Sequence, residues 1–473
     1  MVFSSVVFIL FLLPIFLSLY HFTPSKYKNA VLLGSSIFFY AWGAPLFIFV
    51  LLLSTVIDFY LVGQLYRARG ALKKKWLIAS LVMNLGLLAY FKYANFFIEN
   101  LNFSLKQVGV ESLSWTSVVL PIGISFYTFQ TLTYSIDVYR NNAVPQKKLS
   151  NYVLYIMLFP QMIAGPIVRY NTIAKELEER HPSADDRLIG IYRFCVGLAK
   201  KVLIANVLGA YVDQYMGTVQ GGFFVPDSTL TAWLIMLAYT FQIYFDFSGY
   251  SDMAIGLGRI LGFSFPENFN MPYISKSITD FWRRWHITLG DFMKNYLYIP
   301  LGGNRGSKRL LYTNLVLVFL LSGLWHGASW NFVLWGCYHG FFLVVERLFL
   351  HKLYVKIGSV SILITFLIVM HGWVIFKIED IGVAFQYVQK LWDFSNVYSG
   401  NYQLQLLVTL SVAFLLCFGA LVPKIKKGVQ FYMASQFNVK THIVLIFISV
   451  ILYVLSLSFI LSSNFNPFIY YRF

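Results

Sequence analysis

The chain alternates long apolar runs with short polar loops along almost its whole length. The runs extend over roughly 16 to 25 residues, and a helix needs about 20 apolar residues to cross a hydrocarbon core of about 30 Å. This pattern predicts an all-α, polytopic integral membrane protein with about 11 or 12 transmembrane helices. Because no internal repeat and no polar linker interrupts it, we expect a single transmembrane domain over residues 1–473.

Most of the crossings can be placed by residue number. The first run, Val2 to Tyr20, lacks a basic leading segment and a small-residue cleavage site, so we expect it to remain as a helix. Two short crossings follow, and residues 154–170, which contain Pro160 and Pro166 between basic flanks, favour a re-entrant segment. Further crossings are expected near residues 76–97, 115–139, 190–212, 230–262, 310–328, 329–346, 358–377, 404–421 and 442–461.

Composition supports a membrane protein, and charge gives its orientation. Of the 473 residues 58% are hydrophobic and 12% charged, whereas soluble domains carry about 25% charged residues. The 37 Lys and Arg exceed the 20 Asp and Glu and give a net charge of +17. The excess lies in short loops such as Arg67–Lys75 and Arg140–Lys148, which are expected on the cytoplasmic side. The charge therefore indicates topology and contact with anionic membrane lipids, and no nucleic-acid partner is expected.

Polar side chains inside the apolar runs mark candidate cavities. An ionisable group at the bilayer centre costs on the order of 3 kcal/mol, so it is expected to face protein or water. Asp58, Lys92 and Asp137 fit helix ends or pairs between helices. The segment Tyr244–Gly258 is richer in polar residues and fits either polar ties between packed helices or the lining of a tunnel. Its candidate lining residues are Asp246, Ser248 and Asp252.

The basic, aromatic segment 267–309 predicts an interfacial amphipathic helix. Ser277 and Asp280 resemble a capping box, and apolar residues then recur at helical spacing from Phe281 to Tyr296. His286 within this helix fits either an interfacial anchor or a catalytic residue. Arg305 lies in a glycine-rich loop whose resemblance to a phosphate-binding loop is weak.

His326 lies at the end of an apolar run, in LSGLWHGASWNF. Histidine is the usual general base near neutral pH, and burial favours its neutral, proton-accepting form. The residues alone leave two interpretations open, a catalytic base and a satisfied core histidine. Neighbouring side chains that would surround a substrate here are Trp325, Ser329, Trp330 and Asn331. His339 and the three cysteines lack metal-ligand spacing, so no metal site is expected.

Four motifs together resemble the membrane-bound O-acyltransferase family, and most closely its bacterial alginate and peptidoglycan O-acetyltransferase branch. They are FPQMIAGPIVRY (159–170), FDFSGYSDMAIGLGRILGF (245–263), FWRRWHITL with YLYIPLGGNRG (281–306) and LSGLWHGASWNFVLWGCYHG (321–340). The resemblance covers nearly the whole chain. It implies tilted helices, with re-entrant and interfacial helices, around a central tunnel that joins the two membrane faces.

The resemblance also implies roles for individual residues. His326 matches the family's intramembrane histidine, expected to be the general base, and His286 matches its second histidine. The expected acyl donor is acetyl-CoA, which acts as a substrate and not as a bound cofactor, entering from the cytoplasmic side. The residues expected to contact it are Arg283, Arg284, Asn304 and Arg305. The expected partners are an extracytoplasmic SGNH-type acetyltransferase and an alginate-like or peptidoglycan polymer, at the bacterial cytoplasmic membrane.

The aromatic tail FNPFIYYRF supplies a further hypothesis. It fits an aromatic belt at the outer membrane interface. It is also similar to C-terminal motifs of bacterial systems that acylate envelope polymers, which implies Tyr470 as an acyl relay. Two other functions remain open, a lipid-directed acyltransferase and a non-enzymatic transporter of polysaccharide or ions.

Overall fold

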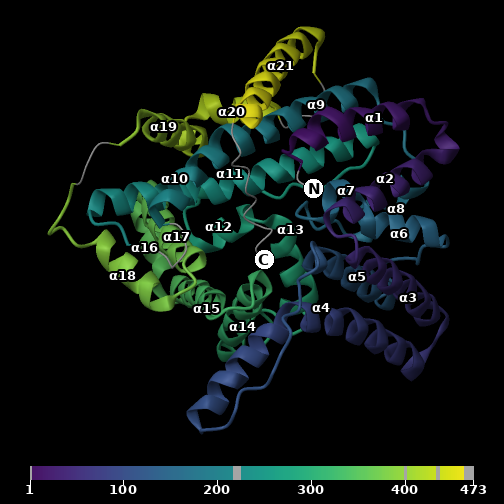
Figure 1. Ribbon diagram of the computed structural model, residues 1–473, viewed down its shortest axis with the longest axis horizontal. Coiled ribbons are helices and arrows are strands. Elements are labelled where there is room, and N and C mark those ends of the chain that lie inside the picture. Colours follow the sequence, from purple (N-terminus) through teal and green to yellow (C-terminus); the bar gives the residue numbers. More distant parts are fainter. Residues whose placement is uncertain (1–2, 217–224, 399–401, 433–436, 463–473) are drawn as a thin grey trace. The chain divides into compact units, whose positions relative to one another are not determined.

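The computed structural model describes residues 3–216, 225–398, 402–432 and 437–462, and within these ranges it is helical without β-strands (Figure 1). Contacts divide the chain into two compact units. Unit 1 comprises Met1–Pro182 with Leu261–Phe265, and unit 2 comprises Ser183–Ile260 with Pro266–Phe473. The single domain expected over residues 1–473 stays a prediction.

Unit 1 contains eight α-helices among its described residues. They are α1 (Leu13–Phe22), α2 (Lys28–Gly43), α3 (Phe47–Arg67), α4 (Gly70–Gln107), α5 (Ile124–Tyr139), α6 (Leu149–Met157), α7 (Phe159–Met162) and α8 (Tyr170–Glu178). The short helices η1 (Phe8–Leu12) and η2 (Ser25–Tyr27) precede α1 and α2.

Unit 2 contains the remaining helices. Its α-helices are α9 (Ala184–Ala199), α10 (Val207–Met216), α11 (Thr229–Leu261), α12 (Ile278–Arg284), α13 (Ile287–Phe292), α14 (Lys308–His326), α15 (Trp330–Val345), α16 (His351–Ile357), α17 (Ser361–Lys377), α18 (Ile381–Leu391), α19 (Leu404–Phe418), α20 (Pro423–Tyr432) and α21 (Val439–Ser462). Its π- and 3-10 turns are η3 (Lys200–Asn206), η4 (Pro272–Ile274), η5 (Met293–Tyr298), η6 (Glu346–Leu350), η7 (Gly358–Val360) and η8 (Gly419–Leu421).

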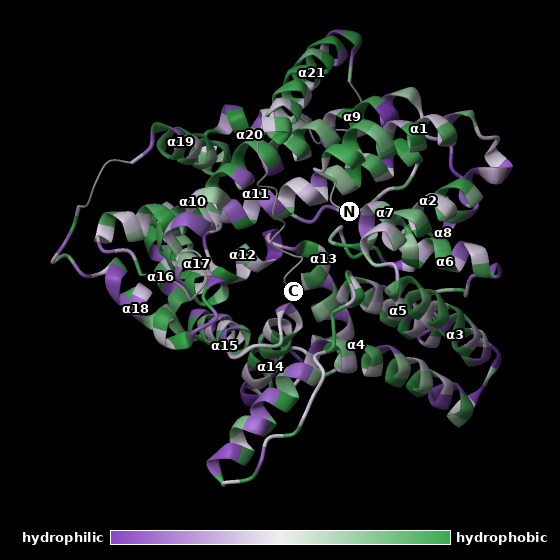
Figure 2. Cartoon of the chain, in the orientation of Figure 1, coloured by the Kyte–Doolittle hydropathy of each residue, from purple (hydrophilic) through white to green (hydrophobic). Residues whose placement is uncertain are grey.

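The prediction of a polytopic membrane protein is confirmed. Seven helical stretches of the described chain are long and apolar enough to cross a membrane, and Figure 2 shows α19 and α21 as largely hydrophobic. These stretches are 47–67, 70–107, 229–261, 308–326, 330–377, 404–421 and 439–462. The expected total of 11 or 12 crossings stays a prediction, because helices such as α2 and α5, with 16 residues each, are shorter than a full crossing.

Most predicted helices lie where the sequence indicated, and three differ. The helix expected near 76–97 is longer and extends over 70–107 as α4. The crossings expected near 230–262, 310–328 and 442–461 correspond to α11, α14 and α21. The helix expected at 115–139 begins only at Ile124, after Gly123 with φ of 77°. The amphipathic helix expected from Phe281 to Tyr296 is broken into α12, α13 and η5.

Helices α9 and α11 pack with their backbones in contact, side by side in Figure 1. A Cβ atom added to Gly197 would lie 2.6 Å from the Gly249 carbonyl oxygen, and one added to Gly190 would lie 2.6 Å from that of Gly256. Glycine at both members of each pair lets the helices approach this closely. The approach also brings the Lys201 ammonium to 2.5 Å from Asp246, and both side chains are 2% exposed.

Buried polar groups in unit 1 tie helices together. The carboxylate of Asp58 on α3 accepts hydrogen bonds from Ser80 at 2.6 Å, Asn84 at 2.8 Å and Tyr152 at 2.5 Å. Asp137 pairs with Arg169 at 3.1 Å. These contacts confirm the interpretation of Asp58 and Asp137 as links between chain segments.

Candidate active site

His326 is the last residue of α14 and is only 3% exposed. Three aromatic rings surround its imidazole. The centroid of Trp325 lies at 4.9 Å, that of Trp335 at 5.0 Å and that of Phe376 at 5.2 Å. These rings come from α14, α15 and α17, so tertiary packing of three helices builds the environment of this histidine. The aromatic walls shield the imidazole from bulk water.

His286 lies at the break between α12 and α13. Its φ and ψ are 46° and 54°, in the left-handed region that non-glycine residues seldom adopt. Such strain persists only where surrounding contacts hold it, and it is concentrated at functional sites. The side chain is 1% exposed, so the alternative of an interfacial anchor is wrong. His286 thus lies in the protein interior at the break between the two helices.

Asn268 determines which nitrogen of His286 carries the proton. Its Oδ1 accepts hydrogen bonds from the Thr288 backbone N–H at 3.2 Å and hydroxyl at 2.9 Å. The same oxygen lies 3.1 Å from Nδ1 of His286, so Nδ1 must donate and Nε2 must present its lone pair. Burial lowers the pKa of His286 to about 3, so the ring is neutral at physiological pH. Within the described residues Nε2 has no hydrogen-bond partner.

Trp325 connects the two histidines. Its ring centroid is 4.9 Å from that of His326 and 6.0 Å from that of His286. The two imidazoles therefore share the indole of Trp325 as a neighbour. This arrangement brings together the two residues that the sequence singled out as catalytic, although 40 positions separate them.

A cavity of about 450 Å³ reaches His286 from a basic rim. Arg283, Lys294 and Arg347 line it together with one acid, Asp291. The inner walls are mostly apolar, and Ser322, which lines the cavity, lies one helical turn before His326 on α14. Cations at the rim and apolar walls inside suit a ligand with an anionic group at one end and an acyl group at the other.

Only two of the four predicted donor-binding residues line this cavity. Arg283 and Asn304 line the cavity. Arg284 instead donates to Asp280 at 2.8 Å and to the Asn270 carbonyl at 3.4 Å, and it is absent from the lining. Arg305 is exposed and is also absent from the lining. Lys294 and Arg347 were not singled out from the sequence, because only folding brings their helices to this rim.

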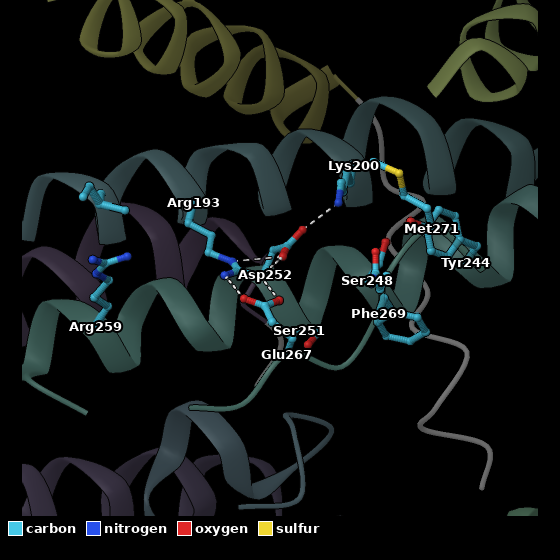
Figure 3. A pocket seen from close by; sticks show the side chains of 12 residues that line it. Arg193, Lys200, Tyr244, Ser248, Ser251, Asp252, Arg259, Glu267, Phe269 and Met271 are labelled. Carbon is cyan, nitrogen blue, oxygen red and sulfur yellow. Dashed lines mark hydrogen bonds and ion pairs between the residues drawn. The ribbon is translucent and has the colours of Figure 1, made fainter. Parts of the chain in front are cut away.

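A second, smaller cavity of about 110 Å³ lies beside α11 (Figure 3). Arg193 binds both Asp252 at 2.9 Å and Glu267 at 2.5 Å, and Lys200 binds Asp252 at 2.6 Å. The predicted tunnel residues Ser248 and Asp252 line this cavity, whereas Asp246 pairs with Lys201. The ion-pair network holds Glu267, the residue next to Asn268, so it braces the loop that orients His286.

The other candidate side chains near His326 differ in how deeply they are buried. Asn331 is fully buried, and its amide nitrogen donates to the carbonyls of Ile375 and Phe376, both at 3.3 Å. Its N–H groups thus hold the chain beside His326. Ser329 is the N-cap residue that precedes α15, and it is partly buried. Trp330 is 55% exposed, so its side chain does not form the buried wall expected of it, and Trp335 on the same helix does.

One predicted site residue could not be placed, and three residues of the site were not predicted. Tyr470 lies outside the described residues. Among the described residues no group of three metal-ligating side chains is found. Asn268, Trp335 and Phe376 were missed by sequence reasoning, and only for Asn268 was there a signal, its place between Pro266 and Pro272 shortly before His286.

Comparisons with known proteins identify the family of the chain. The chain is 43% identical to the probable alginate O-acetylase of Azotobacter vinelandii, over 88% of this chain and 83% of that protein. It is 32% identical to the peptidoglycan O-acetyltransferase of Helicobacter pylori, over 100% of this chain and 98% of that protein. It is 29% identical to the teichoic acid D-alanyltransferase of Bacillus subtilis, over 54% and 68%. Residues 71–378 match the membrane-bound O-acyltransferase family. The chain therefore belongs to this family and is a multi-pass membrane O-acyltransferase.

Proposed function

We propose that this enzyme transfers an acetyl group from cytoplasmic acetyl-CoA, across the bacterial cytoplasmic membrane, for O-acetylation of an extracytoplasmic polymer. The single observation that carries the proposal is the pair of buried histidines next to Trp325, one of which, His286, lines a cavity with a basic rim. Relatives named for O-acetylation of alginate and of peptidoglycan support acetyl as the group transferred and an envelope or exopolysaccharide as its destination.

The basic rim and the apolar inner walls of the cavity orient the donor. The phosphates of CoA suit the rim formed by Arg283, Lys294 and Arg347, since Lys and Arg recognise phosphate through charge-assisted hydrogen bonds. The pantetheine arm and thioester then extend along the apolar walls towards His286 and Ser322. The lone pair on Nε2 of His286 accepts a hydrogen bond from an N–H or O–H group of the bound reactants.

His326 is the general base in the proposed reaction. Its imidazole removes the proton from the accepting hydroxyl as the hydroxyl oxygen attacks the thioester carbonyl carbon. The new C–O ester bond forms, the C–S bond breaks, and the departing thiolate takes the proton from His326. A positioned base of this kind contributes roughly 10²- to 10⁴-fold to the rate.

The first acceptor in this proposal is the hydroxyl of Tyr470. Its acetyl ester is then transferred to an SGNH-type partner outside the membrane, which passes the group to the polymer. The place of Tyr470 in an aromatic segment expected on the outer side supports this role.

The test is transfer from radiolabelled acetyl-CoA by the purified, detergent-solubilised enzyme. We expect wild type to become labelled, and His326→Ala to lose at least about 100-fold in rate. A matched control, His351→Ala, removes an exposed histidine and should keep the wild-type rate. Tyr470→Phe should abolish the protein-bound label, while Tyr471→Phe should retain it.

Other outcomes would contradict specific parts of the proposal. A folded wild type that is inactive with acetyl-CoA in the presence of its partner would show that the donor is wrong. Normal labelling of Tyr470→Phe would remove the relay and leave the acetyltransferase intact. Labelling of a long-chain lipid product would favour a lipid-directed enzyme, and polymer flux that survives His326→Ala would favour a transporter.

A further inference from the structure

Unit 1 contains a cavity of about 700 Å³ that the acyl-transfer site does not use. Three chain segments that are distant in sequence enclose it, around residues 25–33, 146–151 and 178–181. All three belong to basic regions that the charge pattern places at the cytoplasmic face of the membrane. The cavity therefore lies where helices meet the headgroup region of the bilayer.

Cations dominate the lining of this cavity. Five of its residues are Lys or Arg, namely Lys26, Lys28, Lys147, Lys148 and Arg180. Only two acids, Glu178 and Glu179, oppose them, and Glu179 already contacts His181 at 2.9 Å. The excess of positive charge favours an anion, and basic pockets between membrane helices on this side are suited to lipid headgroups.

Hydrogen bonds fix the Arg180 guanidinium, and one of its nitrogens has no acceptor among the described residues. Its Nε donates to the Tyr20 hydroxyl and to the Leu261 carbonyl, both at 3.1 Å, and its Nη1 donates to the Glu176 carbonyl at 2.9 Å. The guanidinium also lies 4.5 Å from the centroid of the Phe263 ring. Its Nη2 is buried, and no described residue accepts a hydrogen bond from it. The chain thus immobilises the cation and leaves one N–H group for a ligand.

Gln146 supplies a second buried donor. It lines the cavity and is 5% exposed. Its Oε1 accepts from the backbone N–H groups of Lys147 at 2.8 Å and Lys148 at 3.3 Å, which fixes the amide orientation. Its Nε2 has no partner within the described part of the chain. A buried amide without a partner costs free energy, and an anionic oxygen would satisfy it.

The cavity continues into an apolar surface on α2. Ala30 and Leu33 form part of its wall, and Ala30 begins a row of exposed residues at four-residue spacing, Ala30, Gly34, Phe38 and Trp42. Such spacing places them on one face of the helix, over about 18 Å of its length. A Cβ added to Gly34 would meet nothing within 4 Å, so the face is open beside the headgroup cavity. An acyl chain has a comparable length.

We propose that this cavity is a binding site for one anionic phospholipid. Its phosphodiester binds the Lys147, Lys148 and Arg180 end and accepts from Arg180 Nη2 and Gln146 Nε2, and one acyl chain lies along the exposed face of α2. A phosphate is the shared chemistry of a lipid headgroup and of soluble phosphates. The continuous apolar face favours the lipid.

The experiment measures thermal unfolding of the full-length, delipidated protein in detergent micelles. Phosphatidylglycerol should raise the unfolding midpoint by at least about 3 °C more than phosphatidylcholine, because it binds the folded state. The double variant Lys147→Gln/Lys148→Gln should lose this difference. A matched control, Lys74→Gln/Lys75→Gln, removes two exposed lysines from another basic loop and should keep it.

Two further arms separate the sources of phosphate. Inorganic phosphate and deacylated glycerophosphoglycerol should leave the midpoint unchanged. Gly34→Phe, which adds bulk on the apolar face without changing charge, should reduce the amount of phosphatidylglycerol that mass spectrometry finds retained after purification. Equal shifts in both double variants, or equal effects of the two lipids, would overturn the site. A shift caused by a soluble phosphate and lost in Lys147→Gln/Lys148→Gln would overturn the lipid assignment.

Discussion

At the scale of single residues, the hydrogen bond between Asn268 and His286 controls the chemistry that His286 can perform. Thr288 donates twice to Asn268 Oδ1, and this orients the amide so that it can only accept from the imidazole. With Nδ1 protonated and the pKa lowered to about 3, Nε2 remains an acceptor over the whole physiological range. Asn268 is therefore a positioning residue, and its effect should be measurable through pH.

Asn268→Asp tests this role. A carboxylate 3.1 Å from Nδ1 favours the protonated imidazole, so the pKa of His286 should rise from about 3. Protonated His286 cannot accept at Nε2, so transfer in the variant should fall as the pH decreases, at a pH where wild type is unaffected. The expected loss is about tenfold or more at the acidic end of the profile. The measurement is the initial rate of acetyl transfer between pH 5 and 8.

A neighbouring substitution provides the comparison. Asn270→Asp makes the same change of charge two residues away, on an exposed residue of the same loop. Its pH profile should coincide with that of wild type. If both variants shift equally, a general change in local charge accounts for the effect, and Asn268 loses its special role.

Sequence reasoning reached part of this site and missed the rest for a physical reason. His326 and Trp325 are adjacent in the chain, so their contact could be predicted. The burial of His286 could not, because apolar spacing from Phe281 to Tyr296 suits one continuous helix. Backbone pairing of Ile287 with Asn268 and of Asn270 with Arg284 interrupts that helix. Backbone contacts with the loop that contains Asn268 and Asn270 thus outweigh the helical preference of the segment from Phe281 to Tyr296.

At the scale of elements, the helix pair α14 and α15 holds the catalytic region together. Both helices carry small residues at four-residue spacing, Gly323 with Gly327 and Gly336 with Gly340. A Cβ at Gly323 would clash with the Phe332 backbone oxygen, and one at Gly336 would clash with that of Phe319. His326 and Trp335 make their 5.0 Å contact across this pair, so the spacing of the two helices sets the walls of the site.

Gly336→Ala should therefore damage both stability and activity. The added methyl group forces the backbones apart, and overpacking of this kind costs about 1–3 kcal/mol or more. We expect a lower unfolding midpoint in detergent and a lower transfer rate. Gly86→Ala on α4 is the comparison, since a Cβ there meets nothing within 4 Å, and it should leave both quantities unchanged. A stable, fully active Gly336→Ala would refute the close packing of α14 and α15.

The helices themselves were largely predictable from hydrophobic runs, and their ends were less so. The run at 230–262 became α11 within one residue at each end. The run at 115–139 placed the start of the helix too early, because Trp115 to Leu120 are apolar enough to continue a helix. Pro121 and Gly123 instead delay its start, and a hydropathy pattern does not register such backbone constraints.

At the scale of the whole molecule, the distribution of Lys and Arg gives an orientation that can be measured. The loop at 67–75 is basic and should lie in the cytoplasm, whereas the loop at 99–114 is poor in basic residues and should lie outside. The proposed entry of acetyl-CoA from the cytoplasm requires this orientation.

Cysteine accessibility in cells tests the orientation. In a Cys337→Ser background, which removes the one exposed native thiol, a membrane-impermeant maleimide should label Glu111→Cys in intact cells. It should label Arg69→Cys only after the membrane that holds the protein is permeabilised. Both positions are exposed, so poor access would not explain a negative result. The reverse pattern would place the basic loops outside and rule out a cytoplasmic donor site on that face.

The buried contact between α9–η3 and α11 has a consequence for biogenesis. Lys201 and Asp246 neutralise each other only when these helices are already side by side, and each charge costs on the order of 3 kcal/mol in lipid alone. A nascent helix that carries Lys201 is consequently a poor candidate for release into the bilayer before α11 has been synthesised. The translocon should retain the first helix until the second arrives and release them together as a hairpin, so that membrane insertion and tertiary pairing are one event for this part of the chain.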